Sequence, residues 1–166
     1  IDSIQVEKTG VKIITKDLLR VVGPKRTILS GCGGSASFLD PSKLPKLSSP
    51  LTVPAGEITR TMKEILKSDI HRLTGGVHVV GLHAREGPIC TREDIGRHNA
   101  IDKIVGEQLL AGRVPLNDRV LGVSGRASFE VVQKAAIAGI PFIVAVGAPS
   151  SLAVELANEL DLTLVR

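Results

Sequence analysis

One cysteine of this 166-residue chain lies where a thiol could do chemistry. Cys32 is in the stretch SGCGGSAS (30–37), in which glycine and serine surround it and no apolar residue can bury it. Glycine leaves the backbone free to move, and an accessible thiol can ionise to the reactive thiolate. This pattern favours a mobile thiol that has to reach partners. The alternative is an incidental cysteine in a turn.

The second cysteine predicts something different. Cys90 lies in GPICT (87–91), an apolar segment, where a free cysteine behaves as a small buried hydrophobe and is chemically inert. The four histidines and two cysteines form neither a CxxC nor an HExxH motif. We therefore expect no metal site.

Basic and hydroxyl side chains recur in three turns that precede helices. The turns are TREDIGRHNAID (91–102), VSGRAS (123–128) and VGAPSS (146–151), and two of them carry arginine. Backbone N–H groups at a helix start, hydroxyls and guanidinium groups together suit a phosphate or pyrophosphate. Their convergence would make an anion site. Taken alone, Ser128 could simply cap a helix and Arg126 could be a solvated charge.

Three histidines can be placed by their spacing. His98 precedes Ile101 and Val105 by three and seven residues, so it leans toward the apolar side of a helix, with Asp102 one turn away. It can serve as acid, base or ligand, or be a satisfied core histidine. His78 and His83 have an odd separation in one strand and are expected on opposite faces.

Apolar periodicity predicts the elements that position these residues. We expect one or two strands in the first thirty residues, an irregular proline-rich connector over 40–54 and a helix over 56–70. Strands are expected at 76–83 and 87–91, then a helix with Asp94 as N-cap, a stripe of Ile101, Val105 and Leu109, and Gly112 as its stop. Beyond these, strands at 119–124, 141–146 and 162–165 alternate with helices at 128–139 and 151–160.

This alternation indicates βαβ units and an α/β fold, a three-layer α/β/α sandwich with a mixed, partly parallel sheet. Residues 1–54 are expected to form the N-terminal strands, the cysteine loop and the connector. Residues 55–166 are expected to form the α/β core of one compact domain.

Composition excludes several classes of protein. The net charge of +4 and pI near 9.3 suit an anionic small ligand, whereas 2% aromatic residues without Trp or Tyr disfavour nucleic-acid binding. No run approaches the ~18 apolar residues of a membrane span. The start has neither Met nor a signal-peptide pattern, as expected for a piece of a longer protein, and the two cysteines predict a reducing, cytoplasmic compartment.

Four long motifs resemble a known family. HRLTGGVHVVGLH (71–83), REDIGRHNAIDKIVGEQL (92–109), SGRASFEVVQKAAIAGIP (124–141) and VGAPSSLAVELA (146–157) are similar to the FdhD family of formate dehydrogenase accessory proteins. The resemblance runs over residues 27–166 and implies a cytidine deaminase-like fold and a homodimer. It also implies a sulfur carrier that accepts persulfide sulfur from a cysteine desulfurase. The carrier then transfers it to the molybdenum bis-molybdopterin guanine dinucleotide cofactor of formate dehydrogenase.

The resemblance assigns roles to residues. The family's loop motif is CGxCG, and the matching stretch here is CGGSA, so Cys32 stands at the first cysteine as persulfide carrier and Ser35 at the second. One thiol remains where the family has two. Family members also have a segment before this one and a C-terminal tail that helps to hold the cofactor. The cofactor-binding residues implied are Arg97, His98, Asn99, Ser124, Gly125, Arg126 and Ser128.

Two other functions are considered. A zinc nucleoside deaminase needs H/C-x-E and P-C-x-x-C, whereas this chain offers GPICTRED with one cysteine, and RHN in place of the acid-bearing motif. A non-catalytic chaperone that shelters the cofactor for formate dehydrogenase is favoured by serine at position 35. The same resemblance makes the chain sulfurtransferase-like, without settling whether it is an enzyme.

Overall fold

The computed structural model describes residues 2–14 and 41–166. Cys32 and Ser35 lie outside these residues, so the predictions made for them stay predictions. Near the N-terminus, β1 (Ser3–Glu7) and β2 (Gly10–Ile14) pair antiparallel in a two-stranded sheet of their own. Strands in the first thirty residues were expected, and the described part of that stretch confirms them.

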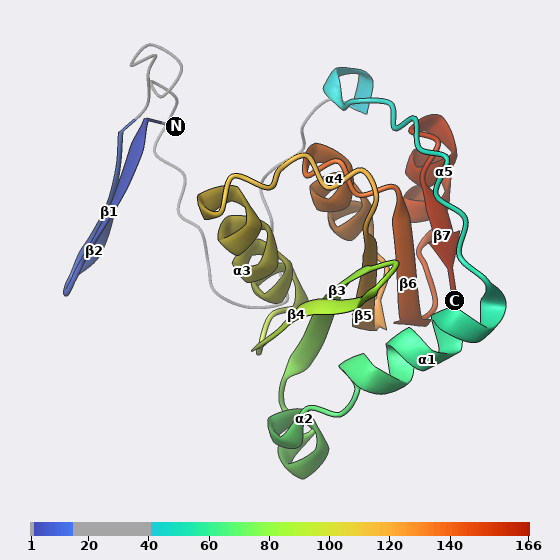
Figure 1. The fold of residues 1–166 in the computed structure, drawn as a ribbon, viewed down its shortest axis with the longest axis horizontal. Coiled ribbons are helices and arrows are strands. Elements are labelled where there is room, and N and C mark those ends of the chain that lie inside the picture. The colour runs from blue at the N-terminus through green and yellow to red at the C-terminus, as the bar shows by residue number, and fades with distance from the viewer. Residues whose placement is uncertain (1, 15–40) are drawn as a thin grey trace.

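A mixed five-stranded sheet in the order β4-β3-β5-β6-β7 forms the centre of the fold (Figure 1). The strands are β3 (His78–Ala84), β4 (Gly87–Asp94), β5 (Val120–Arg126), β6 (Phe142–Gly147) and β7 (Thr163–Val165). β3 runs antiparallel to both β4 and β5, whereas β5, β6 and β7 are parallel. The predicted mixed, partly parallel sheet is therefore confirmed.

Helices cover both faces of this sheet. The larger core joins side chains of one sheet face to α3 (Arg97–Leu110), α4 (Phe129–Ile137) and α5 (Ser151–Glu159). On the other face α1 (Ala55–Ile65) packs its Ile58 and Met62 with Val120 and Val144 of the sheet. The arrangement is the three-layer sandwich that the alternation of elements predicted. A cytidine deaminase-like relationship stays a prediction.

The segment from 41 to 54 is mostly the irregular connector that its prolines indicated. It begins with a short 3-10 turn, η2 (Pro41–Lys43), and has no regular structure afterwards. Leu44 and Leu47 enter the larger core, and Leu51 and Val53 pack with α1. The connector therefore lies along the packed core, while the boundary proposed at residue 54 stays a prediction.

The single helix expected over 56–70 is wrong. α1 ends at Ile65, and a separate helix, α2 (Asp69–Thr74), follows. The reason is Ser68, whose hydroxyl accepts the His71 N–H at 3.0 Å and so caps a new helix. Ile70 is 53% exposed and does not continue the apolar stripe of α1.

The predicted start and stripe of the next helix also need correction. α3 begins at Arg97 with Gly96 as N-cap, because Asp94 still belongs to β4. Its buried residues are Ala100, Ile101, Ile104 and Gln108, whereas Leu109 is 45% exposed and Val105 is half-buried. The buried face of α3 is therefore rotated about the helix axis from the face expected, and it includes the polar residue Gln108. Gly112, with φ +69°, follows its end as expected.

Close packing of α1 on the sheet depends on two glycines. Ile65 is 1% exposed and lies directly over the backbone of Gly81 and Gly122. A Cβ on Gly122 would overlap Ile65 Cδ1 and lie 3.0 Å from Met62 Sδ. A Cβ on Gly81 would lie 2.8 Å from Ile65 Cδ1. No other residue type fits beneath this helix.

We predict opposite effects from two glycine-to-alanine substitutions. Gly122→Ala should lower the free energy of unfolding by about 1–3 kcal/mol, because it overpacks the α1 layer. Gly106→Ala, within α3 with open space around its Cβ, should raise it by about 0.5–1 kcal/mol because alanine restricts the unfolded chain. Urea unfolding measures both. Equal changes in the free energy of unfolding from the two substitutions would contradict this packing. Adding Ile65→Val, which removes the Cδ1 atom that clashes, should restore part of the stability lost in Gly122→Ala.

Candidate anion-binding site

The three turns singled out in the sequence meet at one edge of the sheet. They enclose a depression of about 320 Å³ at the carboxyl ends of β5 and β6. Its lining residues are Arg97, Arg126, Ala127, Ser128, Ala148, Pro149 and Ser150. Parallel strands end at the same edge, where α/β proteins commonly bind ligands. The structure therefore joins residues from all three turns.

Local contacts hold the turns after β5 and β6 together. Arg126 pairs in register with Gly147, after an irregularity that begins at Val123. The Ser150 N–H then donates to the Ala127 carbonyl at 3.0 Å. The Ser150 hydroxyl accepts the Ala153 N–H at 3.2 Å and caps α5. The walls of the depression are thus fixed by backbone pairing.

Two arginines supply positive charge to the depression. Among the described residues neither Arg97 nor Arg126 forms an ion pair, and Arg97 Nε is buried without a hydrogen-bond partner. A buried guanidinium N–H without an acceptor is unfavourable. An anion in the depression would supply the missing negative charge. Sequence reasoning had placed both residues in the site, and here they lie together.

His98 lies next to Ser128 and away from its expected partner. Its Nε2 is 3.2 Å from Ser128 Oγ and 3.9 Å from Glu130 Oε2. Asp102, expected beside it, instead pairs with Lys134 Nζ at 2.6 Å. The charge of Asp102 still raises the pKa of His98, as its place one turn away leads one to expect, but the carboxylate itself is bound by a lysine from α4. Burial, with the charge of Arg97, lowers the pKa of His98 and keeps the ring neutral.

Ser128 occupies the N-cap position of α4, as the plainer interpretation expected. It makes no side-chain cap hydrogen bond, however, and its hydroxyl faces His98. The hydroxyl is also on the wall of the depression. Ser128 is therefore placed where it can contact a ligand, in addition to starting the helix.

Asn99 is held by Asp94, at the start of α3. Its Nδ2 donates to Asp94 Oδ1 at 3.1 Å, and the same oxygen accepts the Gly96 N–H at 2.9 Å. Asp94 Oδ2 pairs with Lys103 Nζ at 2.7 Å. The Lys103 and Gly96 contacts lower the pKa of Asp94 to about 2. Asp94 and Asn99 thus fix the turn that presents Arg97 and His98, and Asn99 does not line the depression.

Ser124 and Gly125 lie just before the depression and do not line it. Ser124 Oγ accepts the Val79 N–H at 2.9 Å, which ties β5 to β3. A Cβ on Gly125 would lie 3.1 Å from His78 Nδ1 and 3.6 Å from Arg97 Cδ. His78 is therefore a neighbour of the site that the sequence did not single out. The only signal for this in the sequence is that His78 directly precedes Val79, whose N–H binds the candidate residue Ser124.

The remaining titratable candidates lie elsewhere. His83 is 3% exposed on the opposite face, near Gly81, as its odd separation from His78 predicted. Cys90 is half-buried, with Gln108 Nε2 at 3.8 Å from its sulfur, and burial raises the pKa of its thiol. It is therefore a poor nucleophile, although less buried than expected. Within the described ranges no cluster of three His, Cys, Asp or Glu side chains could hold a metal.

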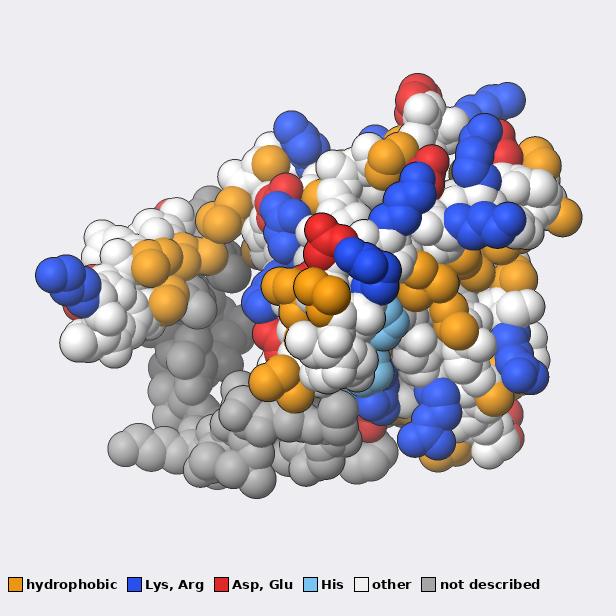
Figure 2. Space-filling model, turned by 90° about the horizontal axis from the view of Figure 1, so that it is seen from below, with side chains coloured by type: hydrophobic (Ala, Val, Ile, Leu, Met, Phe, Trp, Pro, Cys, Tyr) orange, Lys and Arg blue, Asp and Glu red, His pale blue; other side chains and the backbone are white. Residues whose placement is uncertain are grey.

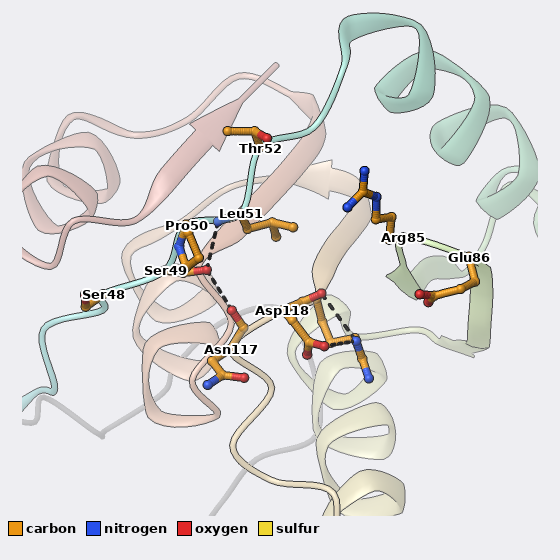
Figure 3. A pocket seen from close by; sticks show the side chains of 10 residues that line it. Ser48, Ser49, Pro50, Leu51, Thr52, Arg85, Glu86, Asn117 and Asp118 are labelled. Atoms are coloured by element: carbon orange, nitrogen blue, oxygen red, sulfur yellow. Dashed lines mark hydrogen bonds and ion pairs between the residues drawn. The ribbon is translucent and has the colours of Figure 1, made fainter.

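A larger pocket of about 480 Å³ lies at the other end of β5, before the strand begins (Figure 3). Arg85 and Glu86 face it from one side and Leu51 from the other, while Asp118 forms an ion pair with Arg119 there. It contains none of the predicted site residues, and its positive and negative side chains balance. Substitutions in this pocket can therefore serve as controls for substitutions in the depression at the opposite edge of the sheet.

The fold and the depression define a class: an α/β protein with a mixed sheet and a basic ligand site at the carboxyl ends of its parallel strands. Comparison with known proteins narrows this class. The family model described as FdhD/NarQ family matches residues 1–166, and the chain belongs to that family. The resemblance inferred from the four motifs is thereby confirmed.

Individual relatives agree with this assignment. Over 97 residues the chain is 60% identical to the sulfur carrier protein FdhD of Nocardia farcinica, covering 58% of this chain and 35% of that protein. Over 143 residues it is 44% identical to the protein of the same name from Mycobacterium tuberculosis, covering 82% and 52%. The chain therefore spans a third to a half of these relatives.

A solved structure is similar as well. The crystal structure of a formate dehydrogenase accessory protein from Desulfotalea psychrophila matches with a TM-score of 0.68 and 35% identity. The match covers 75% of this chain and 53% of that one. In the described part of the present chain, no helix is both long and apolar enough to traverse a bilayer.

We predict that the contribution of Asp94 to stability depends on pH. Because its pKa is about 2 in the folded state and ~4 when unfolded, its stabilising effect is complete above pH 4 and lost as the pH falls toward 2. Asp94→Asn should lower the free energy of unfolding at pH 7 by about 1 kcal/mol. The two proteins should converge in denaturant titrations near about pH 2.

The matched control is Asp69→Asn, whose carboxylate is 80% exposed in its pair with Arg72. It should change stability by less than about 0.5 kcal/mol. A loss in Asp94→Asn that is the same at pH 7 and at about pH 2 would show that the ion pair with Lys103 is not its source.

Proposed function

We propose that this chain is part of a sulfur carrier for formate dehydrogenase maturation. In this proposal Cys32 accepts persulfide sulfur from a cysteine desulfurase. The sulfur then passes to the molybdenum bis-molybdopterin guanine dinucleotide cofactor, which is a substrate of the carrier. Membership of the FdhD/NarQ family and the names of the relatives support this function. A cytoplasmic homodimer is part of the same proposal.

The observation that carries the proposal is the pair of arginines in the depression, Arg97 and Arg126, which form no ion pair with any residue that the structure describes. A dinucleotide cofactor presents a pyrophosphate, and a guanidinium binds such oxygens through charge-assisted hydrogen bonds. Arg97 and Arg126 would donate through their guanidinium groups, and Ser128 lines the same depression with its hydroxyl-bearing side chain. The side chains present therefore fit an anionic group. The cofactor itself supplies the molybdenum centre that receives the sulfur.

The thiol chemistry proposed for Cys32 is a simple exchange. The Cys32 thiolate attacks the outer sulfur of the donor persulfide, a new S–S bond forms, and the donor cysteine leaves as a thiolate. The number of S–S bonds is unchanged, so no oxidant or reductant is consumed. Ser35 leaves Cys32 as the only thiol of this loop. One cysteine is sufficient for this step, whereas a two-cysteine relay would need another.

A second candidate is a chaperone that binds the cofactor for formate dehydrogenase without carrying sulfur. Serine at position 35 favours it, and the arginine depression would serve both functions equally. The zinc nucleoside deaminase is weaker: His98 faces Ser128 and Glu130, and the described residues contain no group of three His, Cys, Asp or Glu side chains that could hold a metal.

We predict a persulfide on Cys32. After incubation with a cysteine desulfurase and cysteine, intact mass spectrometry should show a gain of about 32 Da, one sulfur atom, that a thiol reductant removes. Cys32→Ala should abolish the gain, and Cys90→Ala should keep it because burial holds that thiol protonated. No gain in the wild-type protein would leave the chaperone as the function.

We also predict that the depression binds guanosine diphosphate. Arg126→Gln should weaken binding about tenfold or more in isothermal titration, the loss expected for one charge-assisted contact. Arg119→Gln, in the pocket at the opposite edge, removes the same charge and should leave the affinity unchanged. Equal weakening by both variants would mean that net charge, and not this site, binds the nucleotide.

A further inference from the structure

His78 lies beside the arginine of the depression without being part of its lining. It is the first residue of β3, and its ring and the Arg97 side chain approach Gly125 together. On the face seen from below, histidine side chains lie close to Lys and Arg side chains (Figure 2). A charge on the His78 ring would therefore act on any group that Arg97 holds.

The charges around His78 are unusual because they are mostly of one sign. Arg97 of α3 and His71 of α2 face it, and both oppose its protonation. Asp94 of β4 is its partner in the strand register, but that carboxylate is engaged by Lys103 and Gly96. Within the described ranges the ring of His78 makes no hydrogen bond. Burial, followed by the charge of Arg97, lowers the pKa of His78.

His98, the residue after Arg97, is in a different electrostatic environment. The charges of Arg97 and Lys134 lower its pKa, whereas the carboxylates of Glu130, 3.9 Å away, and of Asp102 raise it. Positive and negative charges are therefore already balanced around it. Of the two histidines, His78 is the one for which the described residues offer no available negative charge, and an anion bound to Arg97 would supply one.

We propose that anion binding in the Arg97–Arg126 depression is coupled to the uptake of a proton by His78. This rests on the proposed function, because it assumes that the depression binds phosphate groups of the cofactor. The bound anion offsets the charge of Arg97 and attracts an imidazolium at His78. Linkage then requires the reverse effect, so a protonated His78 binds the anion more tightly. His78 is a specificity-determining neighbour of the site that favours anions at lower pH.

Sulfate is the probe for this coupling, because it does not change charge across the range in which histidine titrates. NMR titration of the four histidine rings should show the His78 midpoint rising by about half a pH unit when sulfate is added, a threefold effect on affinity. His83, on the opposite face of the sheet, should not move in the same sample. Sulfate affinity should rise as the pH falls from 8 to 5.5, toward a limit of about threefold that is reached once His78 is fully protonated.

Two matched variants assign the effect. His78→Gln should bind sulfate at about pH 8 as the wild type does and lose the increase at lower pH, whereas His98→Gln should keep that increase. Sulfate binding without pH dependence, or a dependence abolished by His98→Gln alone, would overturn the role of His78 and leave the anion site intact. Absence of sulfate binding at every pH would overturn the anion site itself.

Discussion

Parallel pairing of β5 with β6 is the constraint on which the site depends. Because the two strands run in the same direction, the turns that follow them begin at one edge, where Arg126 is paired with Gly147. The Ser150 N–H bonded to the Ala127 carbonyl then fixes the distance between the turns. An antiparallel β6 would place its turn at the far edge, near Arg119, and separate the residues of the depression.

The buried layers keep this edge rigid. On one face α3, α4 and α5 pack into a single apolar core, and on the other Ile65 rests directly on the backbone of Gly81 and Gly122. Polar contacts fix the turns around the site: Asp94 holds the turn before α3, and Ser150 caps α5. The basic side chains are thus presented from elements that cannot easily shift, which lowers the cost of ordering them on binding.

How far the sequence predicts this structure depends on whether contacts are local. The strands and helices after Val120 can be predicted from apolar runs of strand and helix length. The site residues Arg97, Arg126 and Ser128 can be predicted because they lie in turns that precede helices. The break between α1 and α2 at Ser68 cannot be predicted in this way, because Ser68 also binds Glu93 of the distant strand β4. The Asp102–Lys134 pair cannot be predicted either, because Lys134 comes from another helix. His78 and Gly125 are 47 residues apart, and only the antiparallel pairing of β3 with β5 brings them together.

A site built this way is unfavourable to the protein until a ligand arrives. Two arginines that have no carboxylate partner among residues 2–14 and 41–166, one of them with a buried unpartnered N–H, lower the stability of the free fold. Burial and the charge of Arg97 lower the pKa of His78, so a further positive charge beside the same edge is disfavoured. Binding an anion gives the arginines a partner and favours the protonated form of His78. Part of the affinity therefore comes from relieving an unfavourable arrangement of charge, which the apolar core and the contacts of Asp94 hold in place in the free protein.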